Sequence, residues 1–363
     1  MVRDLSTIRG EIARTDADLL RLLNQRARLV GEVAALKEQL QVPFYVPSRE
    51  RQIAERLSAS NPGPFPTEAI RSVFQEIFSA CLTLEKTVRV AYLGPEGTFS
   101  HVAVKRQFGM SARATPIGTI PGVFEEVERG NADLGVVPVE NSTEGVVNHT
   151  LDSFVDSELK ISAEIALEVT MCLLARAGTD LPQIERVYSI PIAAAQVRRW
   201  LATNLPRATL VESRSTTEGA RLAHDDPRGA AVASALAAKL HDLQVLRRNI
   251  QDLSHNMTRF LVLGRQQPEP TGRDKTSLLI VTRDEAGILY RTLGAFAERG
   301  LNMTKIESRP SRRRPWEYVF FLDIDGHQRD EKVAAAIEAV QRDCESLKVL
   351  GSYPKAEPPA AGE

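Results

Sequence analysis

Apolar residues recur at helical spacing along the first forty residues, and this pattern most narrowly limits how the chain can fold. No proline interrupts the stretch, so it predicts one amphipathic helix of about 40 residues. A lone helix cannot bury so long an apolar stripe, and it must therefore pack against other helices. The apolar positions are Ile8, Ile12, Leu19, Leu22, Leu23, Leu29, Val33, Leu36 and Leu40.

Two shorter helices complete an all-α region over residues 1–86. Pro43 and Pro47 interrupt the chain after the first helix, and the segment NPGPFP at 61–66 interrupts it again. The segment TEAIRSVFQEIFSACLTLEK then returns to helical spacing. The region is therefore predicted to be three packed helices.

Composition limits the class of protein and its partners. A chain of 363 residues with 43% hydrophobic and 26% charged residues is typical of a globular protein of two or three domains. Its 46 basic and 47 acidic residues nearly cancel, so neither nucleic acid nor a membrane surface is an expected partner. The start of the chain lacks the apolar core of a signal peptide, and a cytoplasmic location is expected. Three scattered cysteines show no metal-binding or disulfide spacing, and no metal or cofactor is predicted.

The pattern changes at Thr87. Short apolar runs, each followed by a polar turn and a helical stretch, predict an α/β domain over residues 87–267. A segment rich in Pro, Gly and charge, GRQQPEPTGRDK, follows at 264–275 as a linker. Residues 275–353 then read strand, helix, strand, strand, helix, strand, which is the order of a ferredoxin-like α+β domain.

Cations on the first helix are candidates for anion binding. Arg26 and Lys37 are 11 residues apart, which separates them by about 20° around the helix and about 16 Å along it. Arg9 lies roughly 100° away around the same axis, and would serve a neighbouring site if two such helices paired. From spacing alone, a solvated charged face is the alternative. Further charges of interest are Arg49 and Glu50 at the start of the second helix and Glu85 at the end of the third.

Several segments resemble the bifunctional chorismate mutase/prephenate dehydratase family. They are IRGEI, NQRARLVGEVAALK, YVPSRER, SACLTLE and VRVAYLGPEGTFSHVA, and the resemblance continues to about residue 353. It implies an all-α mutase domain over 1–86, a bilobed dehydratase domain of periplasmic-binding type over 87–267, and an ACT regulatory domain over 275–353.

The resemblance implies roles for the helical charges. Arg9, Arg26 and Arg49 correspond to arginines that hold the two carboxylates of chorismate. Lys37 and Glu85 correspond to the pair that faces the ether oxygen, and Glu50 to the contact with the ring hydroxyl. Rearrangement of chorismate needs no nucleophile or cofactor, only a compact conformer and stabilisation of charge on the breaking ether oxygen.

Polar residues follow several strands of the middle domain. Glu140 and Asn141 end one such strand, and Ser189 and Gln196 lie around another strand end. Strand ends and helix N-termini are where open α/β sheets bind anions, although helix capping is the alternative for each loop. A nucleotide site is disfavoured because neither a dinucleotide fingerprint nor a P-loop is present. Together with the family resemblance, these loops predict a dicarboxylate held between two lobes.

The segment LSHNMTRFLVLG places Thr258 and Arg259 directly before a buried apolar run. Alone, these residues could simply solvate a strand end. In the resembled family TRF is the dehydratase signature, which implies that Thr258 assists loss of the ring hydroxyl. Arg259 is then predicted to bind a carboxylate or to support a hydrogen-bond network, with Glu140, Asn141, Ser189 and Gln196 lining the same pocket.

In the last domain, two segments correspond to those that bind L-phenylalanine in the resembled family. They are Gly287, Ile288 and Leu289, and Glu307, Ser308, Arg309 and Pro310. An ACT domain retained only for dimerisation is the alternative.

The sequence thus predicts an enzyme that converts chorismate to prephenate and then to phenylpyruvate, inhibited by L-phenylalanine. A homodimer or higher homo-oligomer is expected, because the long helix needs partners. Two other functions stay open at this point. One is an amino-acid-sensing binding protein built from a bilobed fold and an ACT domain, and the other is an arogenate-preferring dehydratase with a structural mutase-like domain.

Overall fold

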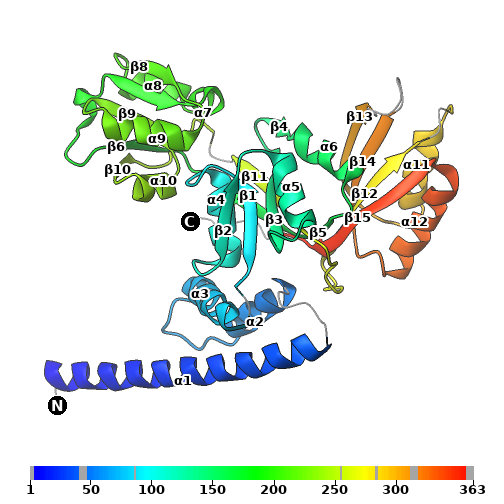
Figure 1. The fold of residues 1–363 in the computed structure, drawn as a ribbon, viewed down its shortest axis with the longest axis horizontal. Coiled ribbons are helices and arrows are strands. Elements are labelled where there is room, and N and C mark those ends of the chain that lie inside the picture. The colour runs from blue at the N-terminus through cyan, green and yellow to red at the C-terminus, as the bar shows by residue number, and fades with distance from the viewer. Residues whose placement is uncertain are drawn as a thin grey trace. The chain divides into compact units, whose positions relative to one another are not determined.

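The computed structural model describes residues 4–40, 47–85, 87–253, 256–282, 285–310 and 318–356 (Figure 1). The chain divides into two compact units. One unit comprises residues 1–88 with 108–113, and the other comprises 89–107 with 114–363. Within the described ranges, no helix combines the length and the apolar character needed to cross a bilayer.

The first unit is helical, as predicted. It contains α1 (Leu5–Leu40), α2 (Pro47–Ala59) and α3 (Thr67–Glu85). The α1 helix has 36 residues, which confirms the single long helix expected from the apolar spacing. Much of its apolar stripe is uncovered in one chain, since Leu19 and Leu36 are 54% and 56% exposed. Within the described residues, α2 and α3 therefore leave much of this stripe exposed in one copy of the chain.

The second unit begins with a lobe built on one mixed sheet. Its strand order is β2-β1-β3-β11-β5, with β4 paired to β3. The strands are β1 (Arg89–Leu93), β2 (Arg113–Ile117), β3 (Leu134–Asn141), β4 (Gly145–Val146), β5 (Lys160–Glu168) and β11 (Met257–Gly264). The helices are α4 (Phe99–Phe108), α5 (Ile120–Glu128) and α6 (Asn148–Asp156).

A second lobe is inserted between β5 and β11. Its sheet has the order β10-β6-β9-β7-β8. The strands are β6 (Cys172–Ala175), β7 (Arg186–Ser189), β8 (Thr209–Glu212), β9 (Gly229–Ala233) and β10 (Gln244–Arg247). The helices are α7 (Pro191–Gln196), α8 (Arg198–Asn204), α9 (Thr216–Asp225) and α10 (Ala235–Leu240), with a short 3-10 turn at Leu181–Gln183.

The two segments of chain that pass between the lobes lie side by side. The backbone N–H of Val169 donates to the carbonyl of Asn256 (2.7 Å), and that of Ile250 donates to the carbonyl of Met171 (3.0 Å). Because the chain returns at Asn256, the next strand starts at the junction of the lobes and brings Thr258 there. This arrangement confirms the predicted bilobed fold.

The last part of the unit has the predicted order of strands and helices. It contains β12 (Asp274–Val281), α11 (Ile288–Ala297), β13 (Met303–Pro310), β14 (Tyr318–Asp325), α12 (Glu331–Asp343) and β15 (Ser346–Pro354). The strands form one antiparallel sheet in the order β13-β14-β12-β15 (Figure 1). This is the ferredoxin-like arrangement expected from the sequence.

The β12–β15 sheet is buried on both faces. Leu278, Ile280 and Leu322 pack with α11 and α12 in one core. Leu279 and Phe321, which alternate with those residues, belong instead to the core of the first lobe. The contact is so close at Gly351 of β15 that a Cβ there would lie 2.3 Å from the carbonyl oxygen of Ile161. The sheet therefore packs directly against the first lobe.

Candidate active site

Strand β11 separates its two polar residues onto opposite faces of the sheet, because successive strand side chains alternate. Thr258 is 9% exposed, and its hydroxyl contacts Asn141 on the neighbouring strand β3. Arg259 contacts β5 and the β12–β15 sheet instead. The two residues of the predicted signature therefore belong to two different networks.

The hydroxyl of Thr258 is held as a hydrogen-bond acceptor. Asn141 Nδ2 donates to Thr258 Oγ1 at 2.8 Å. The amide of Asn141 is fixed in this orientation because its Oδ1 accepts from the backbone N–H groups of Thr143 (2.9 Å) and Glu144 (3.0 Å). Since the amide N–H reaches the oxygen of Thr258, the hydroxyl proton of Thr258 is directed elsewhere. The hydroxyl of Thr258 can therefore donate a hydrogen bond to a ligand.

Asn256 links this pair to the second lobe. It is 2% exposed, accepts from Asn141 Nδ2 (2.7 Å) and donates through Nδ2 to Oε1 of Gln196 (2.8 Å). Gln196, at the end of α7, in turn donates to Thr143 Oγ1 (3.3 Å). Asn256 is not among the site residues predicted from the sequence. The signal was present, because a residue two positions before Thr258 on an extended strand shares its face.

A cavity of about 290 Å³ opens beside this chain of amides. It is lined by Glu140, Asn141, Ser142, Gly145, Val146, Ala166, Met257, Thr258 and Arg259. Of the residues predicted from the sequence, the structure thus brings Glu140, Asn141, Thr258 and Arg259 to one cavity, with Gln196 joined through Asn256. Ser189 lies at the end of β7, where its hydroxyl donates to the carbonyl of Ile190 (3.1 Å).

Other hydroxyl groups of the middle domain form hydrogen bonds with backbone groups. Ser215 caps α9 by accepting from the N–H of Glu218 (2.9 Å). Thr217 and Ser234 donate to the carbonyls of Glu96 (2.6 Å) and Gly97 (2.7 Å), which ties the loop after β1 to the second lobe. The capping alternative accounts for the contact of Ser215, whereas the contacts of Thr217 and Ser234 join two parts of the domain.

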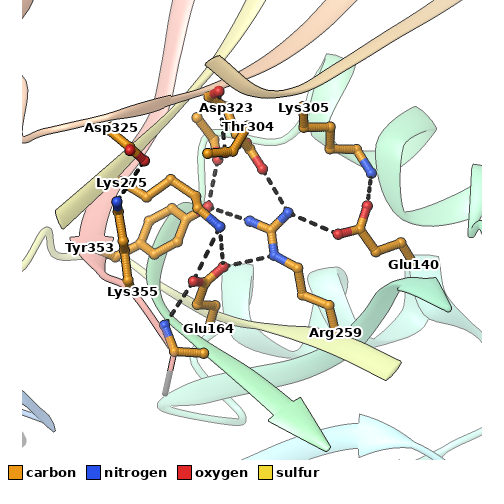
Figure 2. A network of polar contacts seen from close by, with 12 residues as sticks. Glu140, Glu164, Arg259, Lys275, Thr304, Lys305, Asp323, Asp325, Tyr353 and Lys355 are labelled. Carbon is orange, nitrogen blue, oxygen red and sulfur yellow. Dashed lines mark hydrogen bonds and ion pairs between the residues drawn. The ribbon is translucent and has the colours of Figure 1, made fainter. Parts of the chain in front are cut away.

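The guanidinium of Arg259 is almost fully engaged (Figure 2). Nε donates to Glu164 (2.7 Å), Nη1 to Asp323 (2.6 Å) and Glu140 (3.3 Å), and Nη2 to the hydroxyl of Tyr353 (2.9 Å). Four of its five N–H groups are therefore used. Of the two roles that the sequence left open for Arg259, these contacts favour support of a network over capture of a carboxylate.

The network around Arg259 closes on itself. Tyr353 contacts Ser277 Oγ (2.6 Å), and Ser277 donates to Asp323 Oδ1 (2.5 Å), which is the other oxygen of the carboxylate bound by Arg259. Burial raises the pKa of Tyr353 well above its usual range, so this residue stays a neutral phenol. Burial disfavours the charge on Arg259, but the carboxylates of Asp323, Glu164 and Glu140 outweigh it and raise its pKa.

Glu140 bridges the two sides of this network. Its carboxylate accepts from Arg259 and forms an ion pair with Lys305 of β13 (Figure 2). Burial acts to raise the pKa of Glu140, yet the hydrogen bond from Lys305 and the charge of Arg259 outweigh it and lower the pKa. Glu140 is therefore a carboxylate across the neutral range.

The helical unit has its own candidate cluster. The guanidinium of Arg26 lies over the ring of Phe78, 5.0 Å from its centroid. Its Nη1 is buried and has no hydrogen-bond partner within the described ranges. A buried guanidinium N–H that lacks an acceptor is an energetic cost unless an anion occupies the site. Arg26 is thus the best-supported anion-binding residue of the helices.

The other charged residues predicted for this site lie on α1, α2 and α3. Lys37 and Glu50 are half-buried on α1 and α2, whereas Arg9 and Arg49 are exposed. Glu85 is the last residue of α3, and its side chain lies outside the described residues.

The two segments predicted to bind phenylalanine occupy a turn and a strand. Gly287 has a φ of 79°, a left-handed conformation that suits glycine, and it immediately precedes α11 with the buried Ile288 and half-buried Leu289. In β13, Ser308 and Pro310 are exposed, whereas Glu307 and Arg309 are on the half-buried face. Arg309 Nε lies 2.9 Å from Asp152 Oδ1 of α6.

Three protein-family models match consecutive parts of the chain. Chorismate mutase type II matches residues 8–86, Prephenate dehydratase matches 90–268, and the ACT domain matches 276–342.

Similarity to known proteins extends over nearly the whole length. The chain is 48% identical over 359 residues to the bifunctional chorismate mutase/prephenate dehydratase of Aquifex aeolicus, covering 98% of this chain and 99% of that protein. Identity to the protein of the same name in Pseudomonas aeruginosa is 42% over 357 residues, covering 97% and 98%. A crystal structure of prephenate dehydratase from Arthrobacter aurescens in complex with L-Phe is 36% identical, with a TM-score of 0.69 over 74% of this chain and 90% of that chain.

Proposed function

Because this chain belongs to the bifunctional chorismate mutase/prephenate dehydratase family and has both activities, we propose that its two reactions use separate sites in separate domains. Residues 1–86 rearrange chorismate, residues 87–267 convert prephenate to phenylpyruvate, and residues 275–353 bind an effector. The near full-length relatives are named for prephenate, which supports prephenate over arogenate as the substrate. The enzyme would act in the cytoplasm, in phenylalanine biosynthesis.

Thr258 is the proposed catalytic residue of the dehydratase, and its hydrogen bond from Asn141 is the observation that carries the assignment. Loss of the ring hydroxyl requires a proton for the departing oxygen while the ring carboxylate leaves as carbon dioxide. Thr258 donates that proton or a strong hydrogen bond, and aromatisation of the ring makes so weak an acid sufficient. Asn141, Asn256 and Gln196 position the hydroxyl. Glu140 lines the same cavity, and Ser189 is a further proposed pocket residue.

In the mutase site, the proposed groups are cations and one acid. Arg26, Arg9 and Arg49 bind the carboxylates of chorismate, and the buried unpaired Nη1 of Arg26 supports its role. Lys37 and Glu85 stabilise the ether oxygen, and Glu50 binds the ring hydroxyl. The arginine fork matches a carboxylate with two parallel hydrogen bonds, which the ammonium of lysine cannot do.

We propose that the chain works as a homodimer or higher homo-oligomer in which the α1 stripe is covered by a second copy. The exposed Leu19 and Leu36 support this. We expect Leu19→Asp to lower the molecular mass in sedimentation and to reduce mutase activity, because a buried aspartate in the interface is unfavourable. Asp18→Ala, which changes an exposed charge on the same helix, is the control. An unchanged mass for Leu19→Asp would place the subunit contact elsewhere.

L-phenylalanine is the proposed effector of the ACT domain, which the L-Phe complex of the Arthrobacter aurescens protein supports. We expect Ser308→Trp to raise the phenylalanine concentration for half-inhibition of dehydratase at least about tenfold, which corresponds to about 1.4 kcal/mol of lost binding. Ser308 is exposed, so the indole can be accommodated while it blocks the effector. Ser346→Trp, an exposed serine of the same domain, is the control. Unchanged inhibition of Ser308→Trp would mean that the effector binds elsewhere.

A further inference from the structure

The ion pair between Lys305 and Glu140 joins the ACT domain to the strand that carries Asn141 (Figure 2). We propose that Lys305 is a positioning residue of the dehydratase, because it fixes Glu140 and through it the adjacent Asn141–Thr258 pair. This inference rests on the proposed role of Thr258. It makes the ACT domain a structural part of the dehydratase site even when no effector is bound.

Two neighbouring cross-strand pairs connect the ion pair to the reacting hydroxyl. Thr258 lies opposite Asn141, and Arg259 lies opposite Glu140. The next pair is Phe260 opposite Pro138, so the register shifts there and leaves Val139 as an extra residue of β3. A bulge of this kind re-aims the side chains beside it and depends on local contacts. The charged pair is therefore placed where it can set the position of Asn141 and Thr258.

Charge balance explains why the network needs a cation from β13. Three cations, Arg259, Lys275 and Lys305, are paired with three anions, Glu140, Glu164 and Asp323. Without Lys305, Glu140 would depend on Arg259, whose Nη1 it shares with Asp323. It holds Asp323 at 2.6 Å but Glu140 at 3.3 Å, so Glu140 would be the less firmly held of the two.

The geometry of β13 directs Lys305 into this contact. Residues of β13 alternate between half-buried and exposed, with Lys305, Glu307 and Arg309 on the half-buried face. Arg309 on the same face pairs with Asp152 of α6. Two cations of one ACT strand thus bind two anions of the first lobe, and the side chain of Lys305 is only 11% exposed.

The test compares Lys305→Met with Lys305→Arg in the full-length enzyme, without phenylalanine. Methionine keeps the apolar stem of the lysine and removes its charge, whereas arginine keeps the charge. We expect Lys305→Met to lower kcat for prephenate roughly tenfold to hundredfold, as misplacement of a catalytic group does. The KM should change less than about twofold, because Thr258 acts mainly in the transition state. Lys305→Arg should restore most of kcat, and mutase activity should not change.

The pH profile separates positioning from general destabilisation. The groups that face Glu140 are Lys305 and Arg259, with Glu164, Asp323 and Tyr353 behind Arg259. Without Lys305, burial is less opposed and the pKa of Glu140 rises. In the Lys305→Met variant, Glu140 then takes up a proton as the pH falls. The kcat of this variant, relative to that of the parent enzyme, should therefore decrease further as the pH is lowered from about 8 to about 5. The double variant Lys305→Met/Glu140→Gln should lack this growing deficit, since no carboxylate remains to titrate.

Lys332→Met, an exposed lysine on α12 of the same domain, is the matched control and should behave as the parent enzyme. The inference is overturned if Lys305→Met has the parent kcat, or if Lys305→Arg is as impaired as Lys305→Met. An acid-side deficit that persists in the double variant would also contradict it. Failure of the proposed site itself is recognised separately, because Thr258→Ala would then retain dehydratase activity whatever Lys305 does.

Discussion

Thr258→Ala should lower dehydratase kcat by about 10² to 10⁴, the usual contribution of a positioned proton donor, and leave mutase turnover unchanged. The structure gives the reason, because the hydroxyl that accepts from Asn141 has its proton available for the leaving oxygen. Steady-state rates of phenylpyruvate formation from prephenate, and of chorismate loss, measure the two activities on the same preparation.

Thr258→Ser is the matched control. It keeps the hydroxyl and removes only a methyl group, so it should retain dehydratase activity within about tenfold, since only rotamer freedom is added. Equal losses in the serine and alanine variants would show that the methyl group and its packing matter, and not proton donation. Loss of mutase activity together with dehydratase activity would contradict separate sites.

Arg26→Ala should have the reciprocal effect. We expect kcat/KM for chorismate to fall at least about hundredfold, because each charge-assisted hydrogen bond to a carboxylate contributes about 1.5–3 kcal/mol. Dehydration of added prephenate should not change. The guanidinium of Arg26 lies over Phe78 with its Nη1 buried, so a mobile surface cation cannot replace it.

Arg28→Ala provides the control for Arg26, because Arg28 is an exposed arginine on the same helix. Its mutase activity should stay within about twofold of the parent, as for other surface substitutions. If Arg26→Ala is as active as Arg28→Ala, the carboxylates of chorismate are bound by other residues and the proposed orientation of the mutase site is wrong.

The order of elements could be predicted from the sequence because each signal is local. Apolar spacing alone marks the 36-residue α1, and turn residues mark the ends of the strands in the last domain. The position of Thr258 at the start of a buried strand is local as well, and the structure places it there. Such features need no knowledge of which strands pair.

The network around Arg259 could not be predicted, because its members are distant in the sequence. Asp323 and Tyr353 are 64 and 94 residues away from Arg259. In the segment NMTKIESR, charges alternating with other residues read as an ordinary edge strand, and nothing local shows that Lys305 faces another domain. The close approach at Gly351 was equally hidden, since a glycine in a strand has several explanations.

The separation of Thr258 from Arg259 follows from local strand geometry. Adjacent strand residues face opposite sides, so the side chains of Thr258 and Arg259 enter different networks, although both residues line one cavity. The same rule pairs Thr258 with Asn256, two positions earlier. Strand alternation thus contains information on which polar residues act together, even where strand pairing is unknown.

We propose that one chain carries two independent sites that act in sequence. The most direct measurement is a time course with chorismate at neutral pH, in which prephenate and phenylpyruvate are quantified for the parent enzyme, Thr258→Ala and Arg26→Ala. We predict phenylpyruvate from the parent, an equivalent amount of prephenate from Thr258→Ala, and unreacted chorismate with Arg26→Ala, which still converts added prephenate. Phenylpyruvate formation by Thr258→Ala at the parent rate, or failure of that variant to consume chorismate, would contradict the account.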